Sequence, residues 1–146
     1  MKINYAAVGV SALLYWLLGA LWYSPLLFAN KFVALMRWTP EQVARIQTEG
    51  AGKEIALAFL ASLVTAYVLA HVVRYAGAES ATDGAKTALW LWLGLVATGS
   101  LSTVLFEFRP LGLYLISMGY QLFGFLAMGA LLAVWRRREA RATVYV

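Results

Sequence analysis

The stretch Ile55 to Val73 reads IALAFLASLVTAYVLAHVV, and it decides the fold class. No charged side chain interrupts it between Glu54 and Arg74. As a helix rising about 1.5 Å per residue, the stretch is long enough to cross a hydrocarbon core of roughly 30 Å. Its apolar residues run continuously, whereas those of a β-barrel strand alternate with polar ones. The stretch therefore predicts a transmembrane helix.

Three further runs have the same character. They are Tyr5 to Trp22, Thr87 to Phe106 and Leu111 to Trp135. Hydrophobic residues make up 62% of the 146-residue chain, which is more than a water-soluble domain of this length could bury. A cleaved signal peptide is the alternative for the first run. We favour a retained span because the bulky Trp22 and Tyr23 make a poor cleavage site.

The sequence thus predicts an all-α membrane protein built as a four-transmembrane-helix bundle. We expect one integral membrane domain over residues 1–146, with spans at about 4–24, 55–74, 86–106 and 111–135. A short amphipathic helix is expected between spans one and two, within the charged segment Asn30 to Glu54. There Thr39 to Gln42 has the form of a capping box with proline in the first turn, and Gly50 follows as a stop. This helix lies on the membrane surface or over the bundle, or else the segment is a solvated connector.

Basic residues predict the orientation. The strongest local signal is Arg136 to Arg138, directly after the last span, which places the C-terminus in the cytoplasm. An even number of spans then places the N-terminus there as well. The turn at Glu107 to Pro110 and the exit of the first span at Trp22 to Pro25 fall on the opposite, outer side.

Small residues recur at helical spacing within the spans. Because lipid is as apolar as leucine, helices in a membrane associate where small side chains let their backbones approach closely. The stripe residues singled out as packing candidates are Ala58, Ser62, Ala66, Ala70, Gly94, Gly119 and Gly124. The polar row from Thr98 to Thr103, with Ser102, could line a hydrated path. Such hydroxyls more often bond to their own helix, so we favour a structural role.

The outer side carries the candidate ligand or partner face. Its residues are Trp22, Tyr23, Ser24, Pro25, Lys31, Glu107 and Arg109. Pro25 should end the first helix, and Glu107 and Arg109 should form an ion pair across a tight turn. Helix exit with aromatic anchoring, and an ion pair that holds a turn, are the structural alternatives.

Two polar residues fall near the middle of the fourth span. Tyr120 and Gln121 lie there, and we expect Gln121 to bond to Ser, Thr or backbone on a neighbouring helix. A role in a substrate path is the alternative. His71, followed by Arg74, is expected near the cytoplasmic boundary of the second span.

The composition excludes several chemistries. The chain has no Cys and one His, so it offers no disulfide, thiolate nucleophile or multi-histidine metal site. No nucleophile–base pair, paired carboxylates or phosphate-binding glycine loop appears. We expect neither an enzyme nor a nucleic-acid-binding protein, and no catalytic or metal-binding residue is assigned. The sequence leaves any cofactor unknown.

At these motifs the chain resembles the DUF1761 family of small bacterial membrane proteins, which has no assigned function. The motifs are Met1–Tyr5, Gly19 with Trp22–Pro25, Thr39–Glu41, Glu107-x-Arg109-Pro110 and Ile116-x-x-Gly119-Tyr120. The chain departs from the family pattern at Ser117, where Asn is expected. The resemblance implies a multi-span protein of the bacterial cytoplasmic (inner) membrane and brings no catalytic residues.

The leading hypothesis is a non-catalytic helical bundle surrounded by membrane lipid. It would act as an accessory or scaffold subunit of a larger membrane complex, or as a self-associating homo-oligomer. One alternative is a small homo-oligomeric transporter or channel. Another is a pigment-, quinone- or lipid-binding subunit of an energy-transducing membrane complex.

Overall fold

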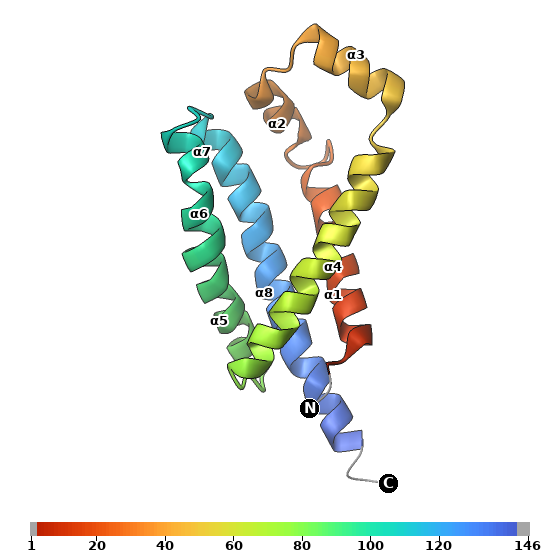
Figure 1. Ribbon diagram of the computed structural model, residues 1–146, viewed down its shortest axis with the longest axis vertical. Helices are drawn as coiled ribbons and strands as arrows, with labels where there is room; N and C mark the ends of the chain where they lie inside the picture. Colours follow the sequence, from red (N-terminus) through yellow and green to blue (C-terminus); the bar gives the residue numbers. More distant parts are fainter. Residues whose placement is uncertain (1–2, 143–146) are drawn as a thin grey trace.

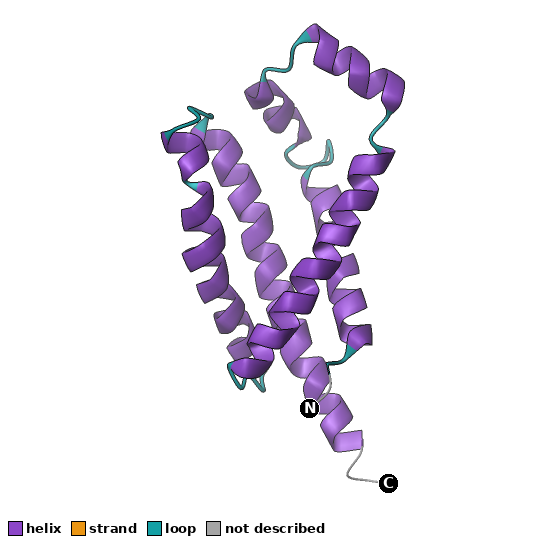
Figure 2. Ribbon diagram, viewed as in Figure 1, coloured by secondary structure: helices purple, strands orange, loops and turns teal. Residues whose placement is uncertain are grey.

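The computed structural model describes residues 3–142, with side chains up to Trp135. Lys2 and the side chains of Arg136 to Arg138, on which the orientation was argued, lie outside the described part. Every regular element of the described chain is a helix (Figure 2). Four stretches are long and apolar enough to cross a membrane, namely Tyr5–Trp22, Gly52–Tyr75, Ala81–Leu105 and Leu111–Trp135. The predicted all-α, four-span fold class is confirmed.

The first span is helix α1, Tyr5–Trp22. Asn4 caps its start, because the side-chain oxygen accepts hydrogen bonds from the backbone N–H groups of Ala6 and Ala7. The helix ends at Trp22 as predicted, because Pro25 has no N–H group and disfavours helical geometry at the residue before it.

Two short helices connect the first and second spans, where the sequence predicted one. Helix α2 covers Ala29–Met36 and α3 covers Pro40–Glu49. Arg37 ends α2 in a left-handed conformation. The predicted capping box of α3 is confirmed, because Thr39 and Gln42 exchange side-chain-to-backbone hydrogen bonds of 3.3 and 2.9 Å.

The second span is α4, Gly52–Tyr75. The third consists of α5 (Ala81–Leu91), a π-helical segment η1 (Trp92–Ala97), α6 (Thr98–Ser100) and α7 (Ser102–Leu105). It begins earlier than the predicted start near residue 86, because Ser80 caps the helix by accepting from the N–H of Asp83. The fourth span belongs to α8, Leu111–Ala142.

The spans are arranged around α8. Helix α1 contacts both α4 and α8, while α5 contacts α8 along the other side (Figure 1). The start of α1 and the end of α8 lie at one end of the molecule, and α2, α3 and the α7–α8 turn lie at the opposite end (Figure 1). This placement agrees with an even number of spans.

The packing between α1 and α4 uses small residues. Ser62, Ala66 and Ala70 of α4 are buried, and so are Ser11 and Ala12 of α1. The predicted stripe on the second span is therefore used within the chain, except at Ala58, which is exposed.

The crossing of α5 and α8 depends on two glycines. A Cβ atom on Gly129 would press on the carbonyl oxygen of Gly84 and would lie 2.6 Å from the Cβ of Ala88. A Cβ on Gly84 would likewise lie 2.7 Å from the Cβ of Ala133. Backbone meets backbone here, so no side chain can rotate away to relieve the contact.

Gly129→Ala should therefore force the two helices apart. We expect the free energy of unfolding in detergent to fall by about 1–3 kcal/mol, the usual cost of overpacking. Gly9→Ala is the matched control, because no atom lies within 4 Å of a Cβ there, and it should be neutral or slightly stabilising. Thermal unfolding followed by circular dichroism measures both. Equal stability of the two variants would contradict the close crossing.

Candidate functional site

The motif residues of the first and fourth spans meet inside the bundle. The indole Nε1 of Trp22 donates a 3.0 Å hydrogen bond to the carbonyl oxygen of Ile116. A Cβ on Gly119 would lie 3.0 Å from the Trp22 ring, so glycine lets the indole rest on α8. The rings of Phe28 and Phe123 flank the indole at 4.8 and 5.7 Å. Trp22 is thus an anchor between helices α1 and α8.

Three tyrosines continue this contact, which we call the α1–α8 seam (Tyr15, Gly19, Trp22, Tyr23, Ile116, Ser117, Gly119, Tyr120 and Gly124). Tyr120 donates to the carbonyl oxygen of Tyr15 over 3.1 Å, and the two rings stack at 4.8 Å. The hydroxyl groups of Tyr23 and Ser117 lie 3.4 Å apart. The hydroxyl groups of Tyr23, Ser117 and Tyr120 therefore each have a partner, which suits polar groups packed between helices.

Glycines make room for the tyrosines of the seam. A Cβ on Gly19 would lie 3.0 Å from the Tyr120 hydroxyl oxygen, and one on Gly124 would press on the Tyr15 ring. Ser24, at the end of the seam, bonds to the carbonyl oxygen of Leu21 over 2.7 Å. The seam is therefore a close-packed contact between α1 and α8.

The hydroxyl row of the third span bonds to its own helix. Thr98, Ser102 and Thr103 donate to the carbonyl oxygens four or three residues earlier, over 2.6, 3.2 and 2.8 Å. This is the structural behaviour that we favoured over a hydrated path. Tyr114 of α8 adds a 2.7 Å bond to the carbonyl oxygen of Ala97, at the end of η1. A π-helical turn frees carbonyl groups, so Tyr114 compensates for the irregular segment.

Gln121 does not make its predicted bond. Among the described residues its side chain has no hydrogen-bond partner, and the neighbouring Tyr120 makes the interhelical bond instead. Sequence spacing could not separate these two adjacent positions, because both lie near the middle of the span. Gln121 lies two turns after Tyr114, on the face of α8 toward the third span.

The turn between the third and fourth spans contains the predicted ion pair. Arg109 Nε lies 3.0 Å from Glu107 Oε2, and the two side chains are 57% and 54% exposed. The backbone N–H of Arg109 donates to the carbonyl oxygen of Thr103 over 3.1 Å. So exposed a pair contributes about 0–1 kcal/mol to stability, and its effect is mainly to fix the turn and the local charge.

A pocket of about 370 Å³ opens between this turn and the end of α2. It is lined by Leu35, Met36, Arg37, Glu107, Phe108, Arg109, Pro110 and Leu113. Gly112 seats α2 here, because a Cβ on it would lie 2.7 Å from Leu35 Cδ1. The structure thus joins Glu107 and Arg109 with Arg37, which the sequence did not single out. It places Lys31 and the seam residues Trp22 and Tyr23 outside the lining.

Backbone strain is concentrated at this pocket. Four described residues have positive φ, and two of them are glycines, Gly50 and Gly77, at the ends of α3 and α4. The other two are Arg37 (φ 49°) and Phe108 (φ 53°), and both line the pocket. Such conformations cost on the order of 1–3 kcal/mol in a residue with a side chain. No sequence signal marks Arg37, because the residue usual at a left-handed helix end is glycine.

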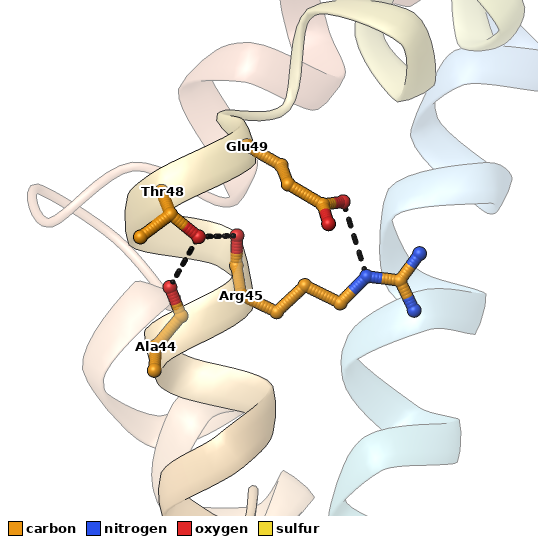
Figure 3. A network of polar contacts seen from close by, with 4 residues as sticks. All are labelled: Ala44, Arg45, Thr48 and Glu49. Atoms are coloured by element: carbon orange, nitrogen blue, oxygen red, sulfur yellow. Dashed lines mark hydrogen bonds and ion pairs between the residues drawn. The ribbon is translucent and has the colours of Figure 1, made fainter.

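A second hollow of about 460 Å³ lies between α3 and the start of α4. Figure 3 shows Arg45 and Glu49 paired along α3, while Thr48 bonds to the carbonyl oxygens of Ala44 and Arg45. The Arg45–Glu49 distance is 3.1 Å, and both side chains are largely exposed. Glu54 also lines this hollow, so the charge of Arg45 is already offset by two carboxylates, those of Glu49 and Glu54. It is the weaker candidate.

The seam allows a direct test. Trp22→Phe keeps a ring against Gly119 but removes the N–H donor, and should lower the free energy of unfolding by about 1 kcal/mol. Trp90→Phe is the matched control, because Trp90 is 72% exposed on α5, and it should change little. Unfolding in mixed micelles by SDS titration measures both variants. If Trp90→Phe costs as much as Trp22→Phe, the buried hydrogen bond is not the cause.

Comparison with protein families agrees with the motifs. The family model described as protein of unknown function (DUF1761) matches residues 6–133. Comparisons with curated proteins and with solved structures found no match. The matched range reaches all four spans, the seam and the pocket. The resemblance drawn from the sequence motifs is confirmed, and the chain belongs to the DUF1761 family.

Proposed function

We propose that this protein is a non-catalytic membrane bundle that self-associates through its third span. The observation that supports the proposal is how little of that span is covered. Within its most apolar segment, 11% of the residues are buried by the chain, against 39% for the fourth span. A homo-oligomer would cover this surface, and membrane lipid would cover the rest.

Two glycines of the third span differ from those of the fourth span. Gly112, Gly119, Gly124 and Gly129 of α8 each receive an atom of a neighbouring helix. Gly94 and Gly99 of the third span have nothing within 4 Å outside their own helix. Lipid gains nothing from small residues, but a second helix gains close backbone approach. The uncovered Gly94, Thr98 and Ser102 therefore support a helix as the occupant of this face.

A second copy of the chain is the simplest occupant. Most oligomers are homo-oligomers, and in a two-fold dimer the same face serves both partners. The π-helical segment lies at this face, and such segments occur mostly at functional sites. An accessory role beside a different membrane protein would use the same surface, and it is the alternative outcome of the test.

Self-association can be measured in lipid vesicles. Photobleaching of singly labelled protein should show pairs at high protein-to-lipid ratios and single copies on dilution. Gly94→Leu should weaken the dimer by about tenfold or more, equivalent to about 1.4 kcal/mol, because it blocks the close approach. A wild-type chain that stays single at every ratio would overturn the proposal.

The matched control places the same substitution on another span. Gly9 of α1 also has open space around it, so Gly9→Leu adds equal bulk away from the proposed face. It should leave the dimer unchanged. If Gly9→Leu disrupts pairing as strongly as Gly94→Leu, the contact does not lie on the third span.

A small homo-oligomeric transporter is the second candidate. The observation in its favour is Gln121, an amide within the fourth span that lacks a partner among the described residues. Polar groups within a span are costly and often mark a path. Gln121→Leu should then lower solute or ion flux into proteoliposomes severalfold, while leaving the amount of folded protein unchanged. Wild-type vesicles without flux above protein-free vesicles would rule this candidate out.

A further inference from the structure

We propose that the pocket between α2 and the α7–α8 turn binds the phosphate group of an anionic phospholipid. Arg37 would contact the phosphate oxygens, and the apolar wall would hold the adjoining acyl chain. The proposal is independent of self-association. The pocket is lined by residues of α2 and the α7–α8 turn. These elements lie at one end of the bundle, whereas the third span runs along its side (Figure 1).

The charge of the pocket leaves one cation free. Three charged side chains line it, namely Arg37, Glu107 and Arg109. Glu107 and Arg109 neutralise each other at 3.0 Å. Arg37 makes no ion pair with any described residue. An anion entering the pocket therefore finds an unpaired guanidinium, whose planar donors suit phosphate oxygens.

The start of α8 adds to this charge. Pro110 and Leu113 line the pocket, so the first turn of a long helix borders it. That turn contains no acidic residue to offset the positive end of the helix. Backbone N–H groups at such a position favour an anion. This feature supports the arginine site and does not define it alone.

The backbone strain at Arg37 suggests that its side chain, and not its backbone conformation, is what this position requires. The chain ends α3 and α4 with glycine where positive φ is needed, but it ends α2 with arginine. Glycine would adopt the same backbone at lower cost. Phe108, which also lines the pocket, carries the same strain. Both residues with an unfavourable positive φ line the same pocket, and this favours a binding role over a purely structural one.

The apolar lining and the position select a lipid. Leu35, Met36 and Leu113 form one wall, and Phe106 and Phe108 beside it are 78% and 87% exposed. The pocket lies where the third span ends and the fourth begins, so it falls at the level of the headgroups. A volume of about 370 Å³ holds a phosphate and part of a glycerol backbone, but not a whole lipid.

Native mass spectrometry of the full chain in mild detergent tests the proposal. The probes are dioleoylphosphatidylglycerol and dioleoylphosphatidylcholine, which share acyl chains and differ in net charge. The first phosphatidylglycerol should bind about tenfold or more tightly than the first phosphatidylcholine, equivalent to about 1.4 kcal/mol. Both lipids offer the same phosphate to Arg37, but the choline ammonium of phosphatidylcholine offsets that negative charge and is repelled by the guanidinium. Equal affinity for both lipids would overturn the proposal, since the pocket would then not select an anionic lipid.

Two substitutions at one position separate binding from folding. Arg37→Gln and Arg37→Gly should both abolish the preference for phosphatidylglycerol. Arg37→Gly should also raise the midpoint of thermal unfolding, because it relieves the left-handed strain. A stable Arg37→Gly variant that keeps the preference would overturn the assignment of Arg37.

The matched control is Lys31→Gln. It removes a cation from the same helix but outside the pocket lining, and it should leave the preference intact. An equal loss in Lys31→Gln would mean that overall charge, and not this pocket, selects the lipid, and it would overturn the proposal.

The last arm distinguishes the source of the phosphate. Millimolar inorganic phosphate, added without lipid, should not raise the thermal midpoint, whereas phosphatidylglycerol should. Inorganic phosphate could instead stabilise the wild type as strongly as phosphatidylglycerol does and leave the Arg37→Gln variant unchanged. In that case the ligand is a soluble phosphate, and the lipid assignment fails.

Discussion

Close approach of α8 to its neighbours is the constraint on which the rest of the structure depends. In a membrane, apolar side chains gain little by leaving lipid for protein, so helices associate through contact distance and a few internal hydrogen bonds. Helix α8 achieves this with four glycines that face α2, α1 and α5. In order, Gly112, Gly119, Gly124 and Gly129 admit Leu35, Trp22, Tyr15 and the backbone of Gly84. The interhelical hydrogen bonds of Trp22 and Tyr120 then fix the rotation of α1 against α8.

The third span follows a different rule. Its first part, α5, crosses α8 at Gly84. The part after α5 is irregular, because it passes through a π-helical segment before the α7–α8 turn. Tyr114 restrains this part by one hydrogen bond to Ala97, while Gly94 remains open. Small residues without a neighbour contribute little packing, and this is why we propose that an external helix covers this span.

Sequence reasoning located the spans, the end of α1 and the cap of α3, because each depends on local rules of hydropathy and backbone donors. It also identified the Glu107–Arg109 pair, whose partners are two residues apart. It could not show contacts between distant segments. It named Trp22 and Tyr23 as candidates for a ligand or partner face, but nothing local shows that their polar atoms reach α8. It overlooked Arg37, because a left-handed φ cannot be read from one residue.

The structure divides three of the motifs shared with the family into two groups with different physical roles. The first and fourth spans contribute Gly19, Trp22, Tyr23, Gly119 and Tyr120 to the α1–α8 seam, where every side chain is explained by packing or a hydrogen bond. The motif Glu107-x-Arg109-Pro110 takes no part in that seam and lines the pocket instead. An exposed ion pair adds little stability, so packing does not account for this second group. The placement of charge accounts for this motif. The charges of Glu107 and Arg109 offset each other, so Arg37 is the one unpaired cation among the residues that line the pocket.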